Sequence, residues 1–253
     1  PDRCIPLFFS DVNDDAGFAQ GFDLYLNPMR RRHPFRARIL WQRARHFLSQ
    51  HKDGHAFLFL ATVEPHLPYT PTEKSLALEW QEPKASWEAA TTAALSKEVA
   101  SGALVMGARE RGFVEALYDA EVRDVDSAFA GMIADLQKLE MWEKTAIILV
   151  GDHGEEMWER GAFGHGRHLY DESIRIPLVV YTPGITPGVV HTPVSTMDVY
   201  ATVLELAGVM TNPEAQSNNL LALKRKGLPE PIFAQLPGYG RSLMVGKYKL
   251  IVP

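Results

Sequence analysis

Residues 146–155 have the sequence Ala-Ile-Ile-Leu-Val-Gly-Asp-His-Gly-Glu, an apolar run that ends in glycine, carboxylate and imidazole. The run 146–150 predicts a buried strand, because a strand covered on both faces needs no polar alternation. In open α/β sheets, ligands bind beyond the carboxyl ends of the strands. Asp152 and His153 therefore stand where reactive side chains are expected.

Two other apolar runs, 56–61 and 177–181, predict further strands that are covered on both faces. Helical spacing of apolar residues predicts helices over 33–51, 113–139 and 198–206. Strands that alternate with helices are typical of an α/β fold, here with a largely parallel central sheet flanked by helices. Four charged residues of the long helix are expected to lie mostly off its apolar stripe: Glu121, Arg123, Asp124 and Asp135.

The chain ends in three short apolar runs that predict the strands of a small α+β subdomain: 232–235, 242–246 and 248–252. We therefore expect two domains, a catalytic one over 1–208 and a small one over 209–253. The Ala-rich segment 73–106 predicts a helical excursion over the core.

The composition excludes several classes of protein. With 46% hydrophobic and 23% charged residues, the chain is typical of a globular protein. No apolar run reaches the ~18 residues of a membrane span, and 26 Lys and Arg against 31 Asp and Glu argue against nucleic-acid binding. The single cysteine, Cys4, excludes an internal disulfide framework.

A second histidine follows the predicted strand 56–61, in the sequence Glu64-Pro65-His66-Leu67-Pro68. The prolines stiffen the turn and restrict where His66 points. Because imidazole exchanges protons near neutral pH, His66 is a candidate general acid or anion ligand. The alternative is a capping histidine bound to the backbone.

The sequence Gly164-His165-Gly166-Arg167-His168 places a third imidazole in a loop suited to close approach of a ligand. We expect Arg167 to be a solvated loop charge, and His168 either binds an anion or is solvated. An oxygen and an imidazole nitrogen side by side at Asp152 and His153 suggest a divalent metal.

These segments, in this order, resemble the sulfatase family of the alkaline-phosphatase superfamily. Similar motifs extend over nearly the whole chain: 18–23, 65–69, 118–126, 151–155, 164–177, 194–208 and 247–250. The resemblance implies an alkaline-phosphatase-like fold and hydrolysis of a sulfuric ester carried by a small molecule or a glycan.

The resemblance also implies roles for four residues. Asp152 and His153 would bind a divalent cation, most often calcium, with manganese or zinc as alternatives. His66 would contact the sulfate or protonate the leaving oxygen, and His165 would contact the sulfate. A cation and these donors would stabilise the charge that shifts as the S–O bond breaks. We expect His66 and His165 to face the Asp152–His153 turn across one cleft.

The family nucleophile lies in a Cys/Ser-x-Pro-x-Arg motif that follows an Asp-Asp metal pair. Cys4-Ile5-Pro6 lacks the arginine, so we expect Cys4 to be a buried strand residue. Asp14-Asp15 is expected to be a turn. The sequence predicts that roughly the first third of the catalytic domain lies upstream. This chain alone should then be inactive, and its sheet flank should pair with the upstream segment or with a second copy.

Other functions remain open. A phosphonate or phosphodiester hydrolase or a phosphoglycerol transferase of the same superfamily shares the Asp-His pair and differs at the nucleophile. A non-catalytic relative would bind a glycan or a protein partner. The sequence does not indicate localisation, although members of the family are often exported.

Overall fold

The computed structural model describes residues 3–7, 17, 19–26, 36–82, 92–210, 212, 214–225 and 231–253. The chain divides into two compact units, Pro1–Glu143 and Lys144–Pro253. The turn expected at Asp14-Asp15 lies outside the described residues. Cys4 lies in a strand, as expected, and the burial of its side chain is outside what is described.

The N-terminal unit contains a parallel strand pair connected through a helix. Strand β1 (Arg3–Leu7) pairs with β2 (Ala56–Leu60), and helix α1 (Ala37–Gln50) lies between them in the sequence. This strand–helix–strand order is the βαβ unit that parallel pairing requires. The predicted helix and strand are confirmed.

The prediction that β2 is covered on both faces is wrong. Phe57 and Phe59 lie two residues apart, so both project from one face of the strand. Their exposed fractions are 38% and 43%.

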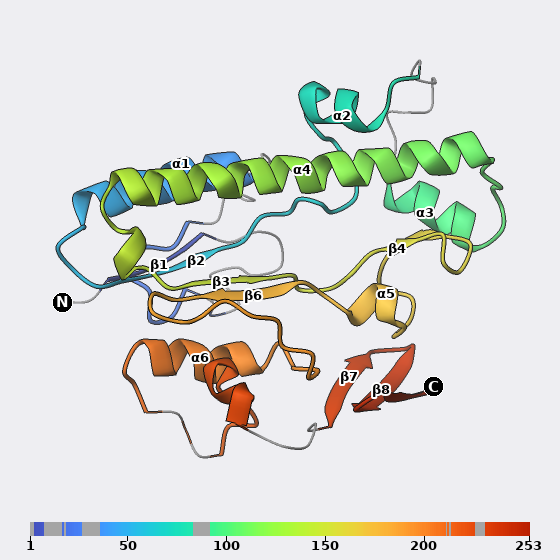
Figure 1. The fold of residues 1–253 in the computed structure, drawn as a ribbon. Helices are drawn as coiled ribbons and strands as arrows, with labels where there is room; N and C mark the ends of the chain where they lie inside the picture. The colour runs from blue at the N-terminus through green and yellow to red at the C-terminus, as the bar shows by residue number, and fades with distance from the viewer. Residues whose placement is uncertain are drawn as a thin grey trace. The chain divides into compact units, whose positions relative to one another are not determined.

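The long helix α4 (Ala108–Lys138) organises the rest of this unit (Figure 1). Helix α1 packs along it, and the indole of Trp41 donates to Asp135 Oδ2 at 3.1 Å. Helix α2 (Glu73–Glu79) also packs on α4, and α3 (Ala93–Ala100) precedes it in the chain. In its described part, the predicted helical excursion is thus present as two short helices.

One charged residue of α4 differs from the expectation. Glu121 is only 2% exposed, so the prediction that it lies off the buried face is wrong. Its carboxyl accepts a hydrogen bond from the backbone N–H of Thr70 at 2.7 Å. That bond offsets part of the cost of removing the group from water.

The C-terminal unit begins near the short 3-10 helix η3 (Trp142–Lys144) and contains strand β3 (Ile147–Val150). Strand β3 pairs with β6 (Leu178–Tyr181) in the antiparallel direction. Between them lie the hairpin of β4 (Glu156–Met157) and β5 (Phe163–Gly164) and the single-turn helix α5 (Asp171–Ile174).

The α/β class holds, but these two strands are not parallel to each other as the expected sheet implied. A parallel pair needs a crossover long enough to return the chain to the start of the sheet. The connection between β3 and β6 contains no such helix, so β6 starts at the end of the pair where β3 finishes.

The chain continues through helix α6 (Asp198–Leu206) and the 3-10 helix η4 (Leu220–Arg225). Gly208 adopts φ +69° directly after α6, which is how a glycine commonly ends a helix. Strands β7 (Ile232–Leu236), β8 (Gly240–Val245) and β9 (Tyr248–Val252) form an antiparallel sheet, which confirms the predicted strands. The domain boundary at 208/209 stays a prediction. In the described part of the chain, no helix combines the length and apolar character that a membrane crossing requires.

Candidate active site

The turn that follows β3 brings Asp152 and His153 together. Asp152 Oδ1 accepts a hydrogen bond from the backbone N–H of His153 at 2.9 Å, and Asp152 Oδ2 lies 3.8 Å from His153 Nε2. The Asp152 side chain is 91% exposed. One cation can therefore contact an oxygen and a nitrogen at this turn, because metal–ligand bonds of about 2–2.6 Å span such a separation.

The ring of His153 is oriented by its own loop. Its Nδ1 lies 2.9 Å from the carbonyl oxygen of Gly154, which can only accept a hydrogen bond. In the neutral ring this contact places the proton on Nδ1 and leaves Nε2 as the nitrogen that can bind a metal.

Glu155 and His165 complete a cluster around this turn. His165 Nδ1 donates to Glu155 Oε2 at 2.9 Å, and the Glu155 side chain is nearly buried. The rings of His153 and His165 lie 4.2 Å apart, centre to centre. Ligand atoms of His153, Glu155 and His165 all lie within 4.8 Å of one another, so this group can hold a metal ion.

A buried carboxylate anchors the loop that carries His165. The Glu156 side chain accepts from Arg167 Nη2 at 2.8 Å and from His168 Nε2 at 3.1 Å. Its other oxygen accepts from the backbone N–H groups of Arg160 and Ala162, each at 3.2 Å. Burial raises the pKa of Glu156, but the hydrogen bonds from Arg167 and His168 outweigh it and hold the pKa below its usual value.

These contacts settle two expectations. Arg167 is bound to Glu156 and to the carbonyl oxygen of Phe163, so the prediction that it is a solvated charge is wrong. His168 lies between Glu156 and Ser173, whose hydroxyl donates to His168 Nδ1 at 3.0 Å. The order serine, histidine, carboxylate is that of a hydrolase triad. Because Ser173 is only 5% exposed, however, the three residues support the loop.

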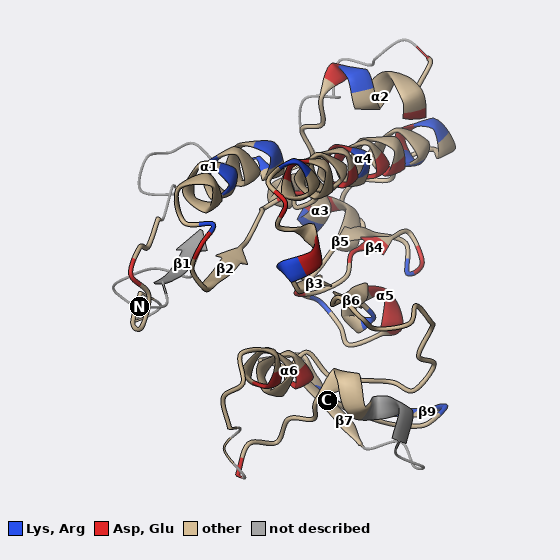
Figure 2. Ribbon diagram, turned by 60° about the vertical axis from the view of Figure 1, so that its left-hand side comes forward, with Lys and Arg blue, Asp and Glu red and all other residues tan. Residues whose placement is uncertain are grey.

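Figure 2 shows acidic residues on the ribbon near β4 and α5, the elements to which Glu156 and Asp171 belong. Gly154 allows the turn after β3 to approach the backbone around α5 closely. Its N–H donates to the carbonyl oxygen of Ser173 at 2.8 Å, and a Cβ at this position would lie 2.2 Å from the carbonyl oxygen of Glu172. The Asp152–His153 turn is therefore packed directly against the backbone around α5.

Replacing Gly154 with alanine should lower the free energy of unfolding by about 1–3 kcal/mol, because the methyl group overlaps backbone that cannot rotate away. Gly131→Ala is the control, since a Cβ there meets no atom within 4 Å. In the interior of α4 that change should stabilise by about 0.5–1 kcal/mol. Denaturant unfolding measures both, and a Gly154→Ala variant as stable as the unmodified chain would contradict the packing described.

His66 lies in the N-terminal unit, in the segment between β2 and α2. Its ring is exposed, and its Nδ1 lies 2.5 Å from the carbonyl oxygen of Leu67. The contact with the backbone matches the capping alternative. It involves only Nδ1 of the ring, so it leaves a catalytic role through Nε2 open. The convergence of His66 on the Asp152–His153 turn stays a prediction.

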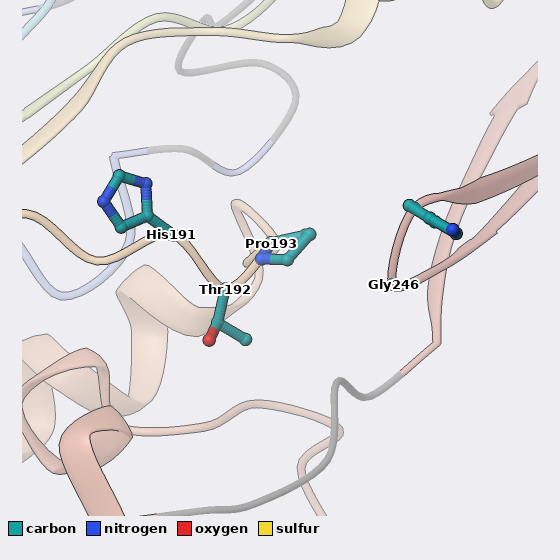
Figure 3. A pocket seen from close by; sticks show the side chains of 5 residues that line it. His191, Thr192, Pro193 and Gly246 are labelled. Carbon is teal, nitrogen blue, oxygen red and sulfur yellow. The ribbon is translucent and has the colours of Figure 1, made fainter.

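A pocket of about 380 Å³ lies elsewhere in the C-terminal unit. Its lining comes from the 191–193 segment and the turn between β8 and β9: His191, Thr192, Pro193, Gly246 and Lys247 (Figure 3). The lining includes no carboxylate and none of the clustered residues. The pocket is thus separate from the cluster at the Asp152–His153 turn.

The sequence model of the family described as Sulfatase matches residues 16–209, which is more than half of the chain. The chain belongs to the sulfatase family. The resemblance expected from the ordered motifs is thus confirmed.

Solved structures confirm the alkaline-phosphatase-like fold of this chain. One is a protein in complex with its substrate D-glucosamine-2-N,6-O-disulfate, with a TM-score of 0.71 and 16% identity over 98% of this chain and 70% of that one. Another is the phosphonate monoester hydrolase of Agrobacterium radiobacter, with a TM-score of 0.66 and 16% identity over 99% of this chain and 71% of that one. At these identities the likeness shows the fold alone.

Curated relatives match this chain over shorter segments. Arylsulfatase K of Mus musculus is 33% identical over 111 residues, which cover 44% of this chain and 20% of that protein. Choline-sulfatase of Rhizobium meliloti (strain 1021) is 35% identical over 92 residues, which cover 36% of this chain and 18% of that protein. The matched segments thus span about a fifth of these relatives' length.

Sequence reasoning missed the two carboxylates that organise this cluster, Glu155 and Glu156. Glu155 belongs to the Gly-Asp-His-Gly-Glu sequence but had no assigned role, and Glu156 had none either. A signal was available, since two adjacent carboxylates precede the basic residues Arg167 and His168 in a short loop. The partners of Glu155 and Glu156 are evident only in the folded structure, where the hairpin of β4 and β5 brings the loop 165–168 back to these carboxylates.

Proposed function

We propose that the protein hydrolyses sulfuric esters and that the Asp152–His153 turn and His165 form part of its catalytic site. The observation that carries the proposal is the grouping of His153, Glu155 and His165 beside Asp152 at the end of β3. A sulfate ester concentrates negative charge on its oxygens as the S–O bond breaks, and converging cationic and proton-donating groups stabilise that charge. We propose a sulfated small molecule or glycan as substrate, since a sulfated sugar is the substrate of one structural relative.

We propose that Asp152 and His153 hold a divalent cation and that this cation is calcium. Support comes from the exposed Asp152 carboxylate and from the Nε2 lone pair of His153. A bound cation would draw electron density from the sulfate oxygens. Calcium takes ~6–8 ligands, mostly oxygens, so further oxygens must complete its shell. The nitrogen-rich set of His153, Glu155 and His165 suits zinc instead, whereas manganese, like calcium, prefers oxygen ligands.

The protein's own side chains supply the remaining chemistry. Glu155 orients the imidazole of His165 and compensates a positive charge on that ring when it binds sulfate. His66 is the proposed proton donor to the leaving alcohol oxygen. No residue of this chain stands in a Cys/Ser-x-Pro-x-Arg sequence. Turnover is therefore expected only from a protein that also supplies that motif.

The substrate class is tested with three esters of one aryl alcohol: a sulfate, a phosphonate monoester and a phosphate diester. The assay uses the 253-residue chain and any longer natural protein that contains it. The proposal requires that kcat/KM be highest for the sulfate and that His66→Ala lower kcat/KM for this ester. A preference for the phosphonate or the diester would favour the alternative hydrolases. Glycan binding without turnover of any ester in either protein would favour the non-catalytic relative.

The metal assignment predicts how calcium stabilises the protein. Because calcium binds the folded state, it should raise the unfolding temperature in a concentration-dependent way. Asp152→Asn should shift this dependence to about tenfold or higher calcium concentration, since the amide oxygen is a weaker ligand than the carboxylate. His165→Ala should leave it unchanged. A calcium response weakened more by His165→Ala than by Asp152→Asn would place the ion on the other ligand set.

A further inference from the structure

The backbone that follows His66 is held by a side chain of α4 and by the side chain of the residue that precedes α1. Glu121 of α4 accepts from the backbone N–H of Thr70 at 2.7 Å. Arg36, the residue that precedes α1, donates to the carbonyl oxygen of Thr70. Both polar backbone groups of Thr70 are thus bound four residues after His66.

The two ends of the same segment are held by the carboxyl groups of Glu64 and Asp124. Glu64 Oε2 accepts from the N–H of Ala37 at 2.7 Å and from the hydroxyl of Thr62 at 2.9 Å. Asp124 accepts from the N–H and the hydroxyl of Thr72, each at 2.7 Å. The three carboxyl groups that hold the segment form the carboxylate clamp: Glu64, Glu121 and Asp124.

Among the described residues, Arg36 is the cation that pairs with the carboxylate clamp. Arg36 Nη1 lies 3.6 Å from Glu64 Oε1 and 3.7 Å from Asp124 Oδ2. Within the described part of the chain, three charged carboxylates would exceed the positive charge that Arg36 supplies. Burial raises the pKa of Glu121 to about 7; Glu64 and Asp124 add to the increase, while the Thr70 hydrogen bond and Arg36 oppose it. The buried carboxyl of Glu121 therefore holds a proton more readily than an ordinary glutamate does.

The geometry of His66 follows from this segment. Its Nδ1 lies 2.5 Å from the carbonyl oxygen of Leu67, and Leu67 itself is buried. A shift of the backbone between Glu64 and Thr70 therefore moves the imidazole ring with it.

We propose that Glu121 is a positioning residue for His66 and that it acts through the backbone of Thr70 to set where the segment 64–72 lies on α4. The proposal rests on the proposed function of His66 as proton donor. The protonated carboxyl of Glu121 holds Thr70 without adding a third negative charge to the carboxylate clamp.

The pH dependence of stability follows from the same group. The pKa of Glu121 lies at about 7 in the folded chain, above its ordinary value of 4.5. The folded state therefore binds the proton more tightly than the unfolded state. The stability linked to this proton is fully present below pH 4.5 and is lost as the pH rises through about 7.

Three variants of α4 test the proposal. Glu121→Gln keeps an oxygen that accepts from Thr70 and cannot ionise. Glu121→Leu removes the acceptor. Glu115→Gln makes the same chemical change at an exposed position of the helix and serves as the control.

Denaturant midpoints and amide exchange test the clamp without an activity assay. The midpoint of the unmodified chain and of Glu115→Gln should fall between pH 5 and pH 8, whereas that of Glu121→Gln should stay level. The Thr70 amide should exchange about tenfold faster or more in Glu121→Leu, because its acceptor is gone. Unchanged Thr70 exchange in Glu121→Leu, or an unchanged pH dependence in Glu121→Gln, would overturn the proposal.

Kinetics in the protein that turns over sulfate esters then separate positioning from general stability. Glu121→Leu should lower kcat by about tenfold to a hundredfold with little change in KM, because a displaced His66 fails in the transition state. Glu121→Gln should restore kcat and extend it to higher pH. Equal losses in the two variants would refute the positioning role. Absence of any sulfate turnover would refute the proposed function, and the exchange data would still decide whether Glu121 positions the segment.

Discussion

Asp152→Ala is expected to lower kcat/KM for an aryl sulfate roughly 10²–10³-fold, in the protein that shows turnover. The substitution removes the exposed carboxylate from the turn after β3 and with it one of the two proposed cation ligands. The loss is comparable to that of one electrostatic contact to the developing charge in other enzymes. Steady-state kinetics over a range of calcium concentrations measure the loss. Raising calcium to saturation should recover only part of the activity of Asp152→Ala.

The matched control for Asp152 is Asp171→Ala. Asp171 is also a carboxylate of the C-terminal unit, and it pairs with Lys249 at 2.8 Å while remaining largely exposed. An exposed ion pair contributes little, so kcat/KM should stay within about twofold of the unmodified protein. If both variants lose activity equally, or if Asp152→Ala keeps full activity, Asp152 is not a ligand of the catalytic cation.

Glu156→Leu is expected to lower the free energy of unfolding by about 3–5 kcal/mol, because it leaves the partly buried guanidinium of Arg167 without its counter-charge and His168 Nε2 without its acceptor. Glu156 is only 1% exposed and binds both Arg167 and His168. Glu156→Gln retains an acceptor oxygen and should cost less, about 1–3 kcal/mol. Denaturant unfolding at neutral pH measures both variants.

The neighbouring residue Glu159 provides the control for Glu156. Glu159 is exposed and accepts one hydrogen bond, from the N–H of Met157. Glu159→Gln should therefore change the free energy of unfolding by about 0.5 kcal/mol or less. A Glu156→Leu variant that unfolds at the same denaturant concentration as Glu159→Gln would show that this network does not stabilise the loop.

The periodicity of apolar residues was sufficient to predict most of the elements. Helices α1, α4 and α6 and strands β2, β3 and β6 lie where helical spacing or continuous apolar runs indicated them. This succeeds because helix and strand repeats are local properties of the chain. The Asp152–His153 pair was also found locally, since it directly follows the apolar run of β3.

The direction of pairing and the fate of charged side chains depended on distant residues. Strand β6 is antiparallel to β3 because the connection between them forms a short hairpin and a single-turn helix, without a crossover helix. Neither strand encodes that connection by itself. Arg167 is bound because the hairpin of β4 and β5 brings Glu156 to it. Neither outcome is visible in a short window of sequence.

Glu121 shows the same limit most clearly. The sequence by itself determined the helix that carries this residue, the family of the chain and the segment that contains His66. Only the tertiary structure decided that the Glu121 carboxyl is buried, since its partner is the backbone N–H of Thr70, 51 positions away in the chain. A charged side chain enters a protein interior when a specific partner offsets its lost hydration, and that partner is set by how distant segments pack.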